Sequence, residues 1–150
     1  MGKAQELAES IVHRYLTLVR YQRYRGGLIQ KTANISGRQL AVLRHLLEKG
    51  PRTVGQIGQF LYVRDATASA MLERMERDGY ITRRRAPEDN RKVLIEPTEL
   101  GRTVVAQAPP GMIWLLRERL PRLSVEELTQ MDEALKKLSE LAEVDESVLE

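Results

Sequence analysis

The chain of 150 residues is 42% hydrophobic and 30% charged with a formal net charge of +3, a composition typical of one folded domain. It contains no cysteine, which excludes disulfides, thiol chemistry and cysteine-ligated metals, and its two histidines are too far apart in sequence to suggest a metal site. No apolar run is long enough to span a membrane, and the N-terminus lacks the apolar core of a signal peptide. We therefore expect a cytoplasmic protein without membrane contact, metal or cofactor. Its basic first third is compatible with a nucleic-acid partner.

The first two predicted elements are helices. Apolar residues recur at helical spacing from Glu6 to about Arg25, and Gly26-Gly27 permits that helix to end or bend. Ser36-Gly-Arg-Gln39 has the form of a capping box, and a leucine stripe follows it until Gly50-Pro51. The second helix is therefore predicted between the serine cap and this Gly-Pro pair.

Two further helices follow, separated by a brief turn. Thr53-Val-Gly-Gln56 is a second capping box, at the start of a helix of about two turns. The turn at residues 62–64 leads into a helix from Asp65 to about Asp78, and Gly79 stands where a left-handed cap is preferred. This pattern predicts a helix-turn-helix.

The helix that begins at Asp65 has two faces of different character. One face is apolar and is expected in the core: Ala68, Met71, Leu72 and Met75. The outward face is small and hydroxylic near its start, with Ala66, Thr67, Ser69 and Ala70. Such residues let a helix lie close to the floor of the DNA major groove. An ordinary exposed helix surface has the same composition, so this face alone does not identify a DNA-binding helix.

Two β-rich runs come next, Tyr80–Arg85 and Arg91–Glu96, and the turn-forming segment Ala-Pro-Glu-Asp-Asn joins them. A β-hairpin after three helices is the pattern of a winged helix-turn-helix. A hairpin this basic can straddle a phosphate backbone and insert a guanidinium into the minor groove, although a solvated charged turn is the simpler alternative. We expect the Asp89 carboxylate to hold the Arg91 side chain by a hydrogen bond.

Nearly the whole chain resembles the MarR (multiple antibiotic resistance regulator) family of winged-helix transcription regulators. The segments "QLAVLRHLLEK" and "RTVGQIGQFLYV" resemble the second and third helices of the family, and "RDATASAMLERMERDGYITRRRAPEDNRK" resembles its recognition helix and wing. The most specific match is Asp89-x-Arg91 followed by Thr98-x-x-Gly101. Pro97 departs from the leucine usual at that position, which should affect the junction after the wing more than DNA contact.

The C-terminal third predicts further helices. Residues 98–108 begin a helix, Pro109-Pro-Gly111 either kinks or breaks it, and the apolar run Met112–Leu116 resumes it. Ser124-Val-Glu-Glu127 is a third capping box. A stripe at helical spacing follows this box and predicts a last helix: Leu128, Met131, Leu135, Leu138 and Leu141. A small winged module leaves such terminal helices without enough core of their own, and a partner chain would supply it.

The resemblance has consequences for organisation and partners. It implies a homodimer in which residues 1–35 and 98–150 form a helical dimerisation region and residues 36–97 form the DNA-binding module. It also implies a small aromatic anion as effector, bound where the dimer helices meet the winged module. The candidate ligand residues there are Arg20, Arg23, Tyr24 and Trp114, although solvated arginines and a core tryptophan are the structural alternative.

The function expected from these patterns is a dimeric regulator, with repression as the favoured sign, that binds palindromic double-stranded DNA. The candidate DNA-binding residues are Arg38, Arg64, Asp65, Ala66, Thr67, Ser69, Ala70, Arg74, Arg77, Arg84, Arg85, Asp89, Arg91 and Lys92. The alternative is a winged-helix architectural or protein-interaction module that does not read bases. No nucleophile with a nearby base, paired catalytic carboxylates or phosphate loop is recognisable, so an enzyme is not expected.

Overall fold

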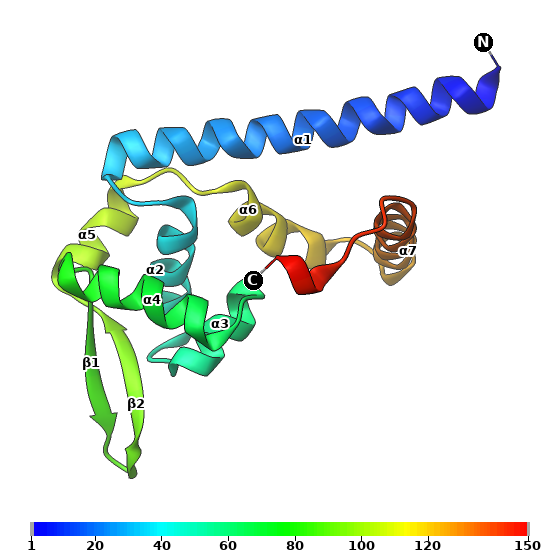
Figure 1. The fold of residues 1–150 in the computed structure, drawn as a ribbon. Coiled ribbons are helices and arrows are strands. Elements are labelled where there is room, and N and C mark those ends of the chain that lie inside the picture. Colours follow the sequence, from blue (N-terminus) through cyan, green and yellow to red (C-terminus); the bar gives the residue numbers. More distant parts are fainter. Residues whose placement is uncertain (1, 150) are drawn as a thin grey trace.

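The computed structural model describes residues 2–149, which form seven α-helices, one antiparallel β-hairpin and two short 3-10 helices. In chain order they are α1 (Lys3–Ala33), α2 (Gly37–Lys49), α3 (Val54–Leu61), α4 (Asp65–Arg77), β1 (Ile81–Ala86), β2 (Asp89–Pro97), α5 (Glu99–Gln107), α6 (Met112–Arg119), a 3-10 turn (Leu120–Arg122), α7 (Val125–Leu141) and a second 3-10 turn (Glu146–Val148). Helices α2 to α5 and the hairpin form a small module, and the N-terminal half of α1 projects beyond it (Figure 1). The predicted winged helix-turn-helix is confirmed.

The caps predicted from the sequence set the starts of the helices. Ser36 Oγ accepts a hydrogen bond from the Gln39 N–H, and the Gln39 side chain accepts one from the Ser36 N–H. Thr53 and Gln56 form the same reciprocal pair at the start of α3. Ser124 accepts from the Glu127 N–H, but the glutamate side chain bonds the serine hydroxyl instead of the backbone. The third capping box is therefore only half formed.

Helix α1 is longer than the sequence predicted. It runs through Gly26-Gly27 without a break and ends at Asn34, whose φ of 53° is left-handed. The continuation has a structural reason, because it carries Ile29 into the core, where that side chain is only 1% exposed. A buried isoleucine offsets the modest cost of glycine inside a helix.

The hairpin turn is shorter than predicted. Only Pro87 and Glu88 lie between the strands, because Ala86 pairs with Asp89. The ladder has an irregularity between Arg85 and Ala86, which places the extra residues of β2 at the wing tip. At the base of the wing, the backbone of Arg52 pairs with Ile95 in both directions and ties the wing to the segment after α2.

The core lies inside the winged module. Most of its fully buried side chains come from α2, α3, α4 and the hairpin, joined by Ile29 and Ile35 from the end of α1 and the loop after it; they include Leu40, Leu43, Leu46, Ile57, Leu72, Met75, Ile81 and Ile95. The predicted inward face of α4 is confirmed, and Gly79 closes that helix at a φ of 88°. Among the described residues no polar or charged side chain is buried. Within residues 2–149 there is also no helix both long and apolar enough to cross a membrane.

The junction after the wing depends on the Thr98-x-x-Gly101 motif. Thr98 caps α5 by accepting a hydrogen bond from the Gly101 N–H, and its hydroxyl donates to the Gly79 carbonyl. Gly101 is buried, and a Cβ at this position would lie 2.4 Å from the Tyr80 carbonyl oxygen. The motif therefore lets α5 lie directly on the start of β1.

Beyond α5 the chain breaks rather than kinks. Helix α5 ends before Ala108, whose backbone is extended, and α6 begins after Gly111. Proline at 109 and 110 removes two backbone donors, which explains the break. Neither α6 nor α7 contributes a buried residue to the protomer.

Candidate nucleic-acid interface

The recognition helix α4 presents an open face. Asp65, Ala66, Ala70, Arg74 and Arg77 are exposed, whereas Thr67 and Ser69 are half-buried. The two hydroxyl residues therefore lie at the edge of the face rather than at its centre. Arg74 and Arg77 stand in the last turn of the helix, where positive charge is favoured by the helix dipole.

Helix α4 is placed by the shorter helix α3. Gly58 of α3 is buried, and a Cβ there would lie 3.1 Å from the Val63 carbonyl oxygen and 3.3 Å from the Asp65 carboxylate. The turn between the helices is closed by Tyr62, which has a left-handed φ of 58° and whose side chain is 85% exposed. The close approach at Gly58 fixes the start of the recognition helix against α3.

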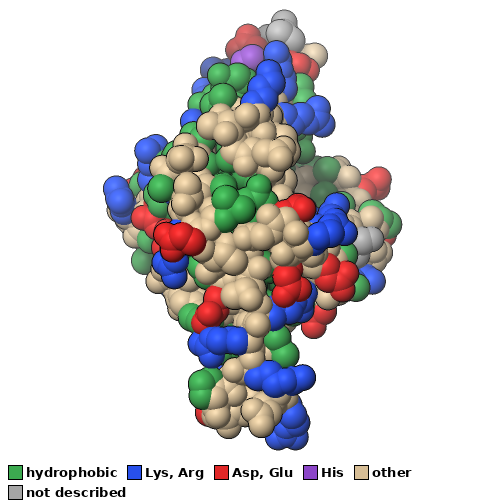
Figure 2. Space-filling view, turned by 90° about the vertical axis from the view of Figure 1, so that its left-hand side faces the viewer, with side chains coloured by type: hydrophobic (Ala, Val, Ile, Leu, Met, Phe, Trp, Pro, Cys, Tyr) green, Lys and Arg blue, Asp and Glu red, His purple; other side chains and the backbone are tan. Residues whose placement is uncertain are grey.

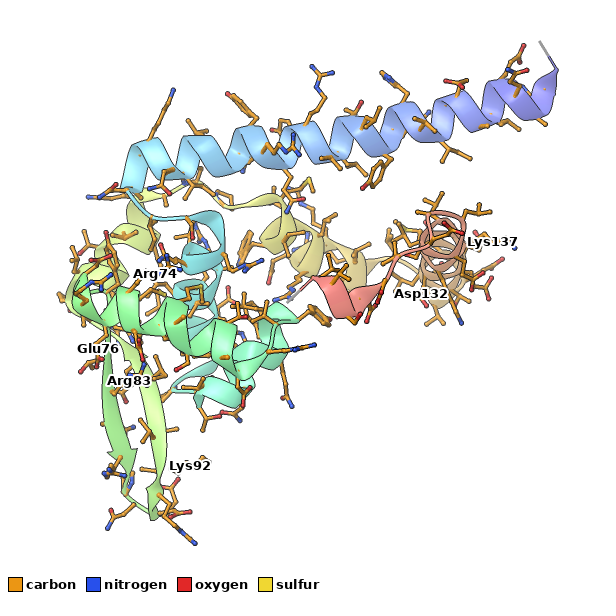
Figure 3. All side chains as sticks on the ribbon, in the orientation of Figure 1. Arg74, Glu76, Arg83, Lys92, Asp132 and Lys137 are labelled. Carbon is orange, nitrogen blue, oxygen red and sulfur yellow. The ribbon has the colours of Figure 1, made fainter. Side chains whose placement is uncertain are left out.

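An ion pair joins the recognition helix to the wing. Arg83 Nε of β1 lies 3.4 Å from Glu76 Oε1 of α4, and Figure 3 shows the two side chains facing one another at the base of the wing. Because a surface ion pair contributes only about 0–1 kcal/mol, its role here is orientation more than stability. It also uses Arg83 within the protein instead of leaving that charge for a phosphate.

The wing tip carries the best-positioned cation. Asp89 Oδ1 accepts hydrogen bonds from the Arg91 backbone N–H at 3.0 Å and from Arg91 Nε at 3.4 Å, as the sequence predicted. The Arg91 side chain remains 94% exposed, so the rest of its guanidinium can meet a phosphate or a minor groove. Figure 2 shows basic side chains gathered on the projecting wing.

A groove lies between the wing tip and the start of α3. It has a volume of about 430 Å³ and is lined by Thr53, Val54, Gly55, Asp89, Arg91, Lys92 and Val93. A helix N-terminus and two basic side chains on one concave surface suit a backbone phosphate. Sequence reasoning missed the residues of α3 here, although the capping box at Thr53 marked this helix start.

The remaining candidate residues are less uniform. Arg84 is paired with Glu96 on the neighbouring strand at 2.5 Å, and Arg85 donates to the Asn90 carbonyl. Arg38 is exposed on the first turn of α2, at the opposite end of that helix from the Arg52–Ile95 bridge. Lys92 lies near the wing tip (Figure 3), and Arg64 occupies the N-cap position of α4 without a side-chain capping hydrogen bond. DNA contact by each of these residues stays a prediction.

The predicted ligand residues are not brought together. Arg20, Arg23 and Tyr24 are exposed on α1, whereas Trp114 is half-buried and donates from Nε1 to Glu48 of α2 at 3.1 Å. Among the described residues no hydrogen bond or ring contact joins the tryptophan to the other three.

Two other arginines converge instead on the broken segment between α5 and α6. Arg25 of α1 donates to the Pro110 carbonyl, and Arg44 of α2 donates to the Ala108 carbonyl at 3.0 Å. The Nε atom of each is buried without a hydrogen-bond partner, and Arg44 also lies 5.4 Å from the Trp114 ring centre. Burial lowers the pKa of Arg44, and the nearby Glu48 carboxylate opposes this shift. This cluster of cations has spare donors.

The fold and this basic surface define a winged-helix DNA-binding protein. Residues 35–93 match the model of the MarR family. The chain is 40% identical over 109 residues, 71% of each protein, to the organic hydroperoxide resistance transcriptional regulator of Bacillus subtilis. It belongs to the MarR family and is a DNA-binding transcriptional regulator, and members of this family are not enzymes.

Solved structures share the fold. BldR of Sulfolobus solfataricus superposes with a TM-score of 0.60 at 25% identity and covers 96% of this chain and 100% of its own. Sco3205, a MarR family regulator of Streptomyces coelicolor in complex with DNA, has a TM-score of 0.63 at 18% identity, covering 93% of this chain and 89% of its own. At that identity the second likeness concerns the fold alone.

Arg91→Ala should weaken operator binding by about tenfold and lower the salt slope by about one phosphate equivalent. The reason is the exposed guanidinium held at the wing tip, and the thermal midpoint should not change because the side chain supports no packing. A fluorescence anisotropy titration at several salt concentrations measures both quantities. Arg122→Ala, which removes the same charge outside the winged module, is the control. Equal salt slopes for the two variants would contradict this contact.

Proposed function

We propose that this protein is a homodimeric repressor that binds a nearly palindromic operator and responds to a small aromatic anion. The observation that carries the dimer is the set of large apolar side chains left exposed on α1 and α7. On α1 these include Leu7, Ile11, Tyr15 and Leu18, which are between 47% and 57% exposed, and on α7 Leu135 is 61% exposed. Exposed apolar stripes of this length on two helices mark an interaction surface.

The proposed dimer divides the chain as the sequence suggested. Residues 1–35 and 98–150 supply the dimerisation helices, and residues 36–97 supply the DNA-binding module. The burial pattern supports this division, because Ile29 is the only described residue of α1 that is buried and α7 has none. One qualification concerns α5, whose Val104 is buried in the core of the winged module. Residues 98–108 therefore belong structurally to the module as well.

A twofold dimer sets the form of the operator. Its two α4 helices would enter successive major grooves on one face of the duplex, about 34 Å apart. Repression then needs no activity beyond occupying promoter DNA. Sedimentation and footprinting test this mechanism: the protein should sediment as a dimer at micromolar concentration and protect both half-sites. Equal affinity for the palindrome and for scrambled DNA would instead support an architectural module, because a regulator prefers its site by about a thousandfold or more.

The effector site is proposed at the arginine pair Arg25 and Arg44. The guanidiniums of Arg25 and Arg44 converge on the α5–α6 segment, and Arg44 lies beside the Trp114 ring, so charge and stacking surface for a carboxylate on an aromatic ring are both present. The site joins α1, α2 and the α5–α6 segment. A bound ligand would therefore change how the dimerisation helices are held against the winged module. Arg20, Arg23 and Tyr24 remain candidates for the outer rim only.

The name of the Bacillus relative refers to resistance to organic hydroperoxides. Hydroperoxides oxidise thiolates most readily, and these 150 residues contain no cysteine. We therefore propose a bound anion rather than thiol oxidation as the signal of this chain.

Benzoate, as the simplest aromatic carboxylate, should change the fluorescence of Trp114, the single tryptophan of the chain. Arg44→Gln should weaken this response by about tenfold or more, because it removes a charge-assisted contact. Arg14→Gln serves as the matched control on the exposed surface of α1, outside the candidate ligand residues. An equal fluorescence response to benzoate in both variants would place the ligand elsewhere.

Brief exposure to cumene hydroperoxide should leave operator affinity unchanged.

A further inference from the structure

Helix α6 is attached to the winged module through the tips of a few side chains. It has no buried residue of its own, and the proline break before it removes helical continuity with α5. Its ties to the module include the Trp114–Glu48 hydrogen bond, the approach of Arg44 to the Trp114 ring and the contacts of Arg117 with α3. Because α6 leads to α7 (Figure 1), these ties determine how the arm is held against the module.

Arg117 contacts the C-terminal end of α3 in two ways. Its Nη2 donates to the Phe60 carbonyl at 2.7 Å, and its guanidinium carbon lies 3.9 Å from the centre of the Phe60 ring. The carbonyls of the last helical turn lack helical partners and carry the negative end of the helix dipole, so a cation is favoured there. Arg117 therefore caps α3 from another helix.

The opposite face of the same ring is occupied by His45 of α2. The two rings are stacked with centres 3.9 Å apart and an angle of 8° between their planes. Two groups this close to one ring centre cannot share a face, so Phe60 is sandwiched between a histidine and an arginine. The sandwich connects α2, α3 and α6 in one stack.

We propose that Arg117 is a positioning residue that couples the arm formed by α6 and α7 to the recognition helix, and that protonation of His45 releases this coupling. This proposal rests on the proposed dimeric DNA-binding function, because it describes how pH would control that function. Helix α3 sets the start of α4 through the close approach at Gly58, so a change at the end of α3 reaches the DNA-binding face directly. We name the Arg117–Phe60–His45 stack the latch.

The charges around His45 oppose its protonation while the latch is closed. Burial lowers the pKa of His45 first, followed by Arg52 after α2, Arg117 of α6 and Lys49 of α2, while Glu48 of α2 acts in the opposite direction. A lowered pKa in the closed state means that the open state binds more protons. The closed latch is therefore intact above the ordinary histidine pKa of 6.5 and is progressively lost as the pH falls below it.

The test uses the full chain and a palindromic operator, with affinity measured between pH 8.0 and pH 5.5. His45→Gln removes the titrating group, Arg117→Gln removes the latch cation, and the double variant completes the cycle. Arg119→Gln lowers the charge of the same helix equally without touching α3, and His13→Gln removes the other histidine of the chain. Thermal unfolding at both pH values confirms that each variant is folded.

We expect the parent protein to lose at least about fivefold more affinity than His45→Gln over this pH range. In the Arg117→Gln background, His45→Gln should have no further effect on the pH profile, whereas in the Arg119→Gln background it should keep its full effect. A merely structural Arg117 would lower affinity at every pH and leave the His45 effect in place, which overturns the proposal. Failure of the parent protein to prefer the palindrome at pH 8.0 would instead refute the proposed function itself.

Discussion

Replacing Leu135 and Leu138 by glutamate should turn the proposed dimer into a monomer and reduce operator affinity at least about a hundredfold. Both residues lie on the α7 stripe, and a carboxylate buried in a dimer interface without a partner costs several kcal/mol. A monomer also makes only half of the phosphate contacts, which lowers affinity further. The protomer should remain folded, because Leu135 is 61% exposed and α7 contributes no buried residue.

Sedimentation velocity and footprinting on the same samples measure this effect. Lys136→Glu is the matched control, since it changes the net charge by the same two units on an exposed position of α7 away from the stripe. A double variant that still sediments as a dimer would show that this stripe is not the interface. A variant that is monomeric yet binds the full operator as tightly as the parent would show that dimerisation does not serve DNA binding.

Gly101→Ala should lower the stability of the winged module by about 2–4 kcal/mol, or roughly 10 °C in thermal midpoint. The added Cβ would lie 2.4 Å from the Tyr80 carbonyl oxygen and 3.1 Å from Leu43 Cδ2. Both neighbours are held in place. The Tyr80 carbonyl accepts a hydrogen bond from the Thr98 N–H, and Leu43 is packed in the core. Helix α5 must therefore move away from the wing junction, and operator affinity should fall with stability.

Gly27→Ala is the natural comparison for this variant. It is also a helical glycine, but no atom lies within 4 Å of the added methyl group, so the change should stabilise α1 by about 0.5–1 kcal/mol. Thermal unfolding followed by circular dichroism separates the two effects by sign. A stabilised Gly101→Ala variant would mean that the junction relaxes freely and that the motif has another purpose.

Much of the fold could be predicted because local signals and tertiary structure agree. The capping residues Ser36 and Thr53 and the inward face of α4 each specify one arrangement, and the structure contains it. The helix end predicted at Gly26-Gly27 was wrong. A glycine ends a helix only when no tertiary contact of the residues after it stabilises further helical turns. Here that contact is made by Ile29, whose burial in the module is invisible in a local pattern.

The wing shows the same limit in strand register. Three of the five residues between the predicted strands, Pro87, Asp89 and Asn90, favour turns, so composition alone does not decide which residues form the turn. The register of residues 81–85 is set at the other end of the hairpin, where Ile81 and Ile95 enter the core. Continued unchanged, it would pair Ala86 with Lys92, but the irregularity after Arg85 pairs Ala86 with Asp89 instead. The register also pairs Arg84 with Leu94, two residues from Glu96 on the same face of the strand, and the ion pair of Arg84 with Glu96 partly neutralises one predicted DNA contact within the protein.

The candidate sites differed in how far they could be predicted. Asp89 and Arg91 are two residues apart, so their hydrogen bond follows from local geometry. The pair Arg25 and Arg44 is separated along the chain and meets only because the segment at Pro109-Pro110 crosses both helices. The family resemblance placed the ligand near Arg20 and Arg23, which the structure leaves exposed.

The buried core lies between Ile29 and Ala108. The two parts of the protein should therefore respond differently to protein concentration. The winged module carries its own core, so its unfolding is a first-order process that is insensitive to protein concentration. In the proposed dimer, α1 and α7 gain their burial only from a second chain, so their order should rise and fall with protomer concentration. An operator that holds two modules side by side would raise the local concentration of these helices, and DNA would then act as a ligand of dimerisation as much as its target.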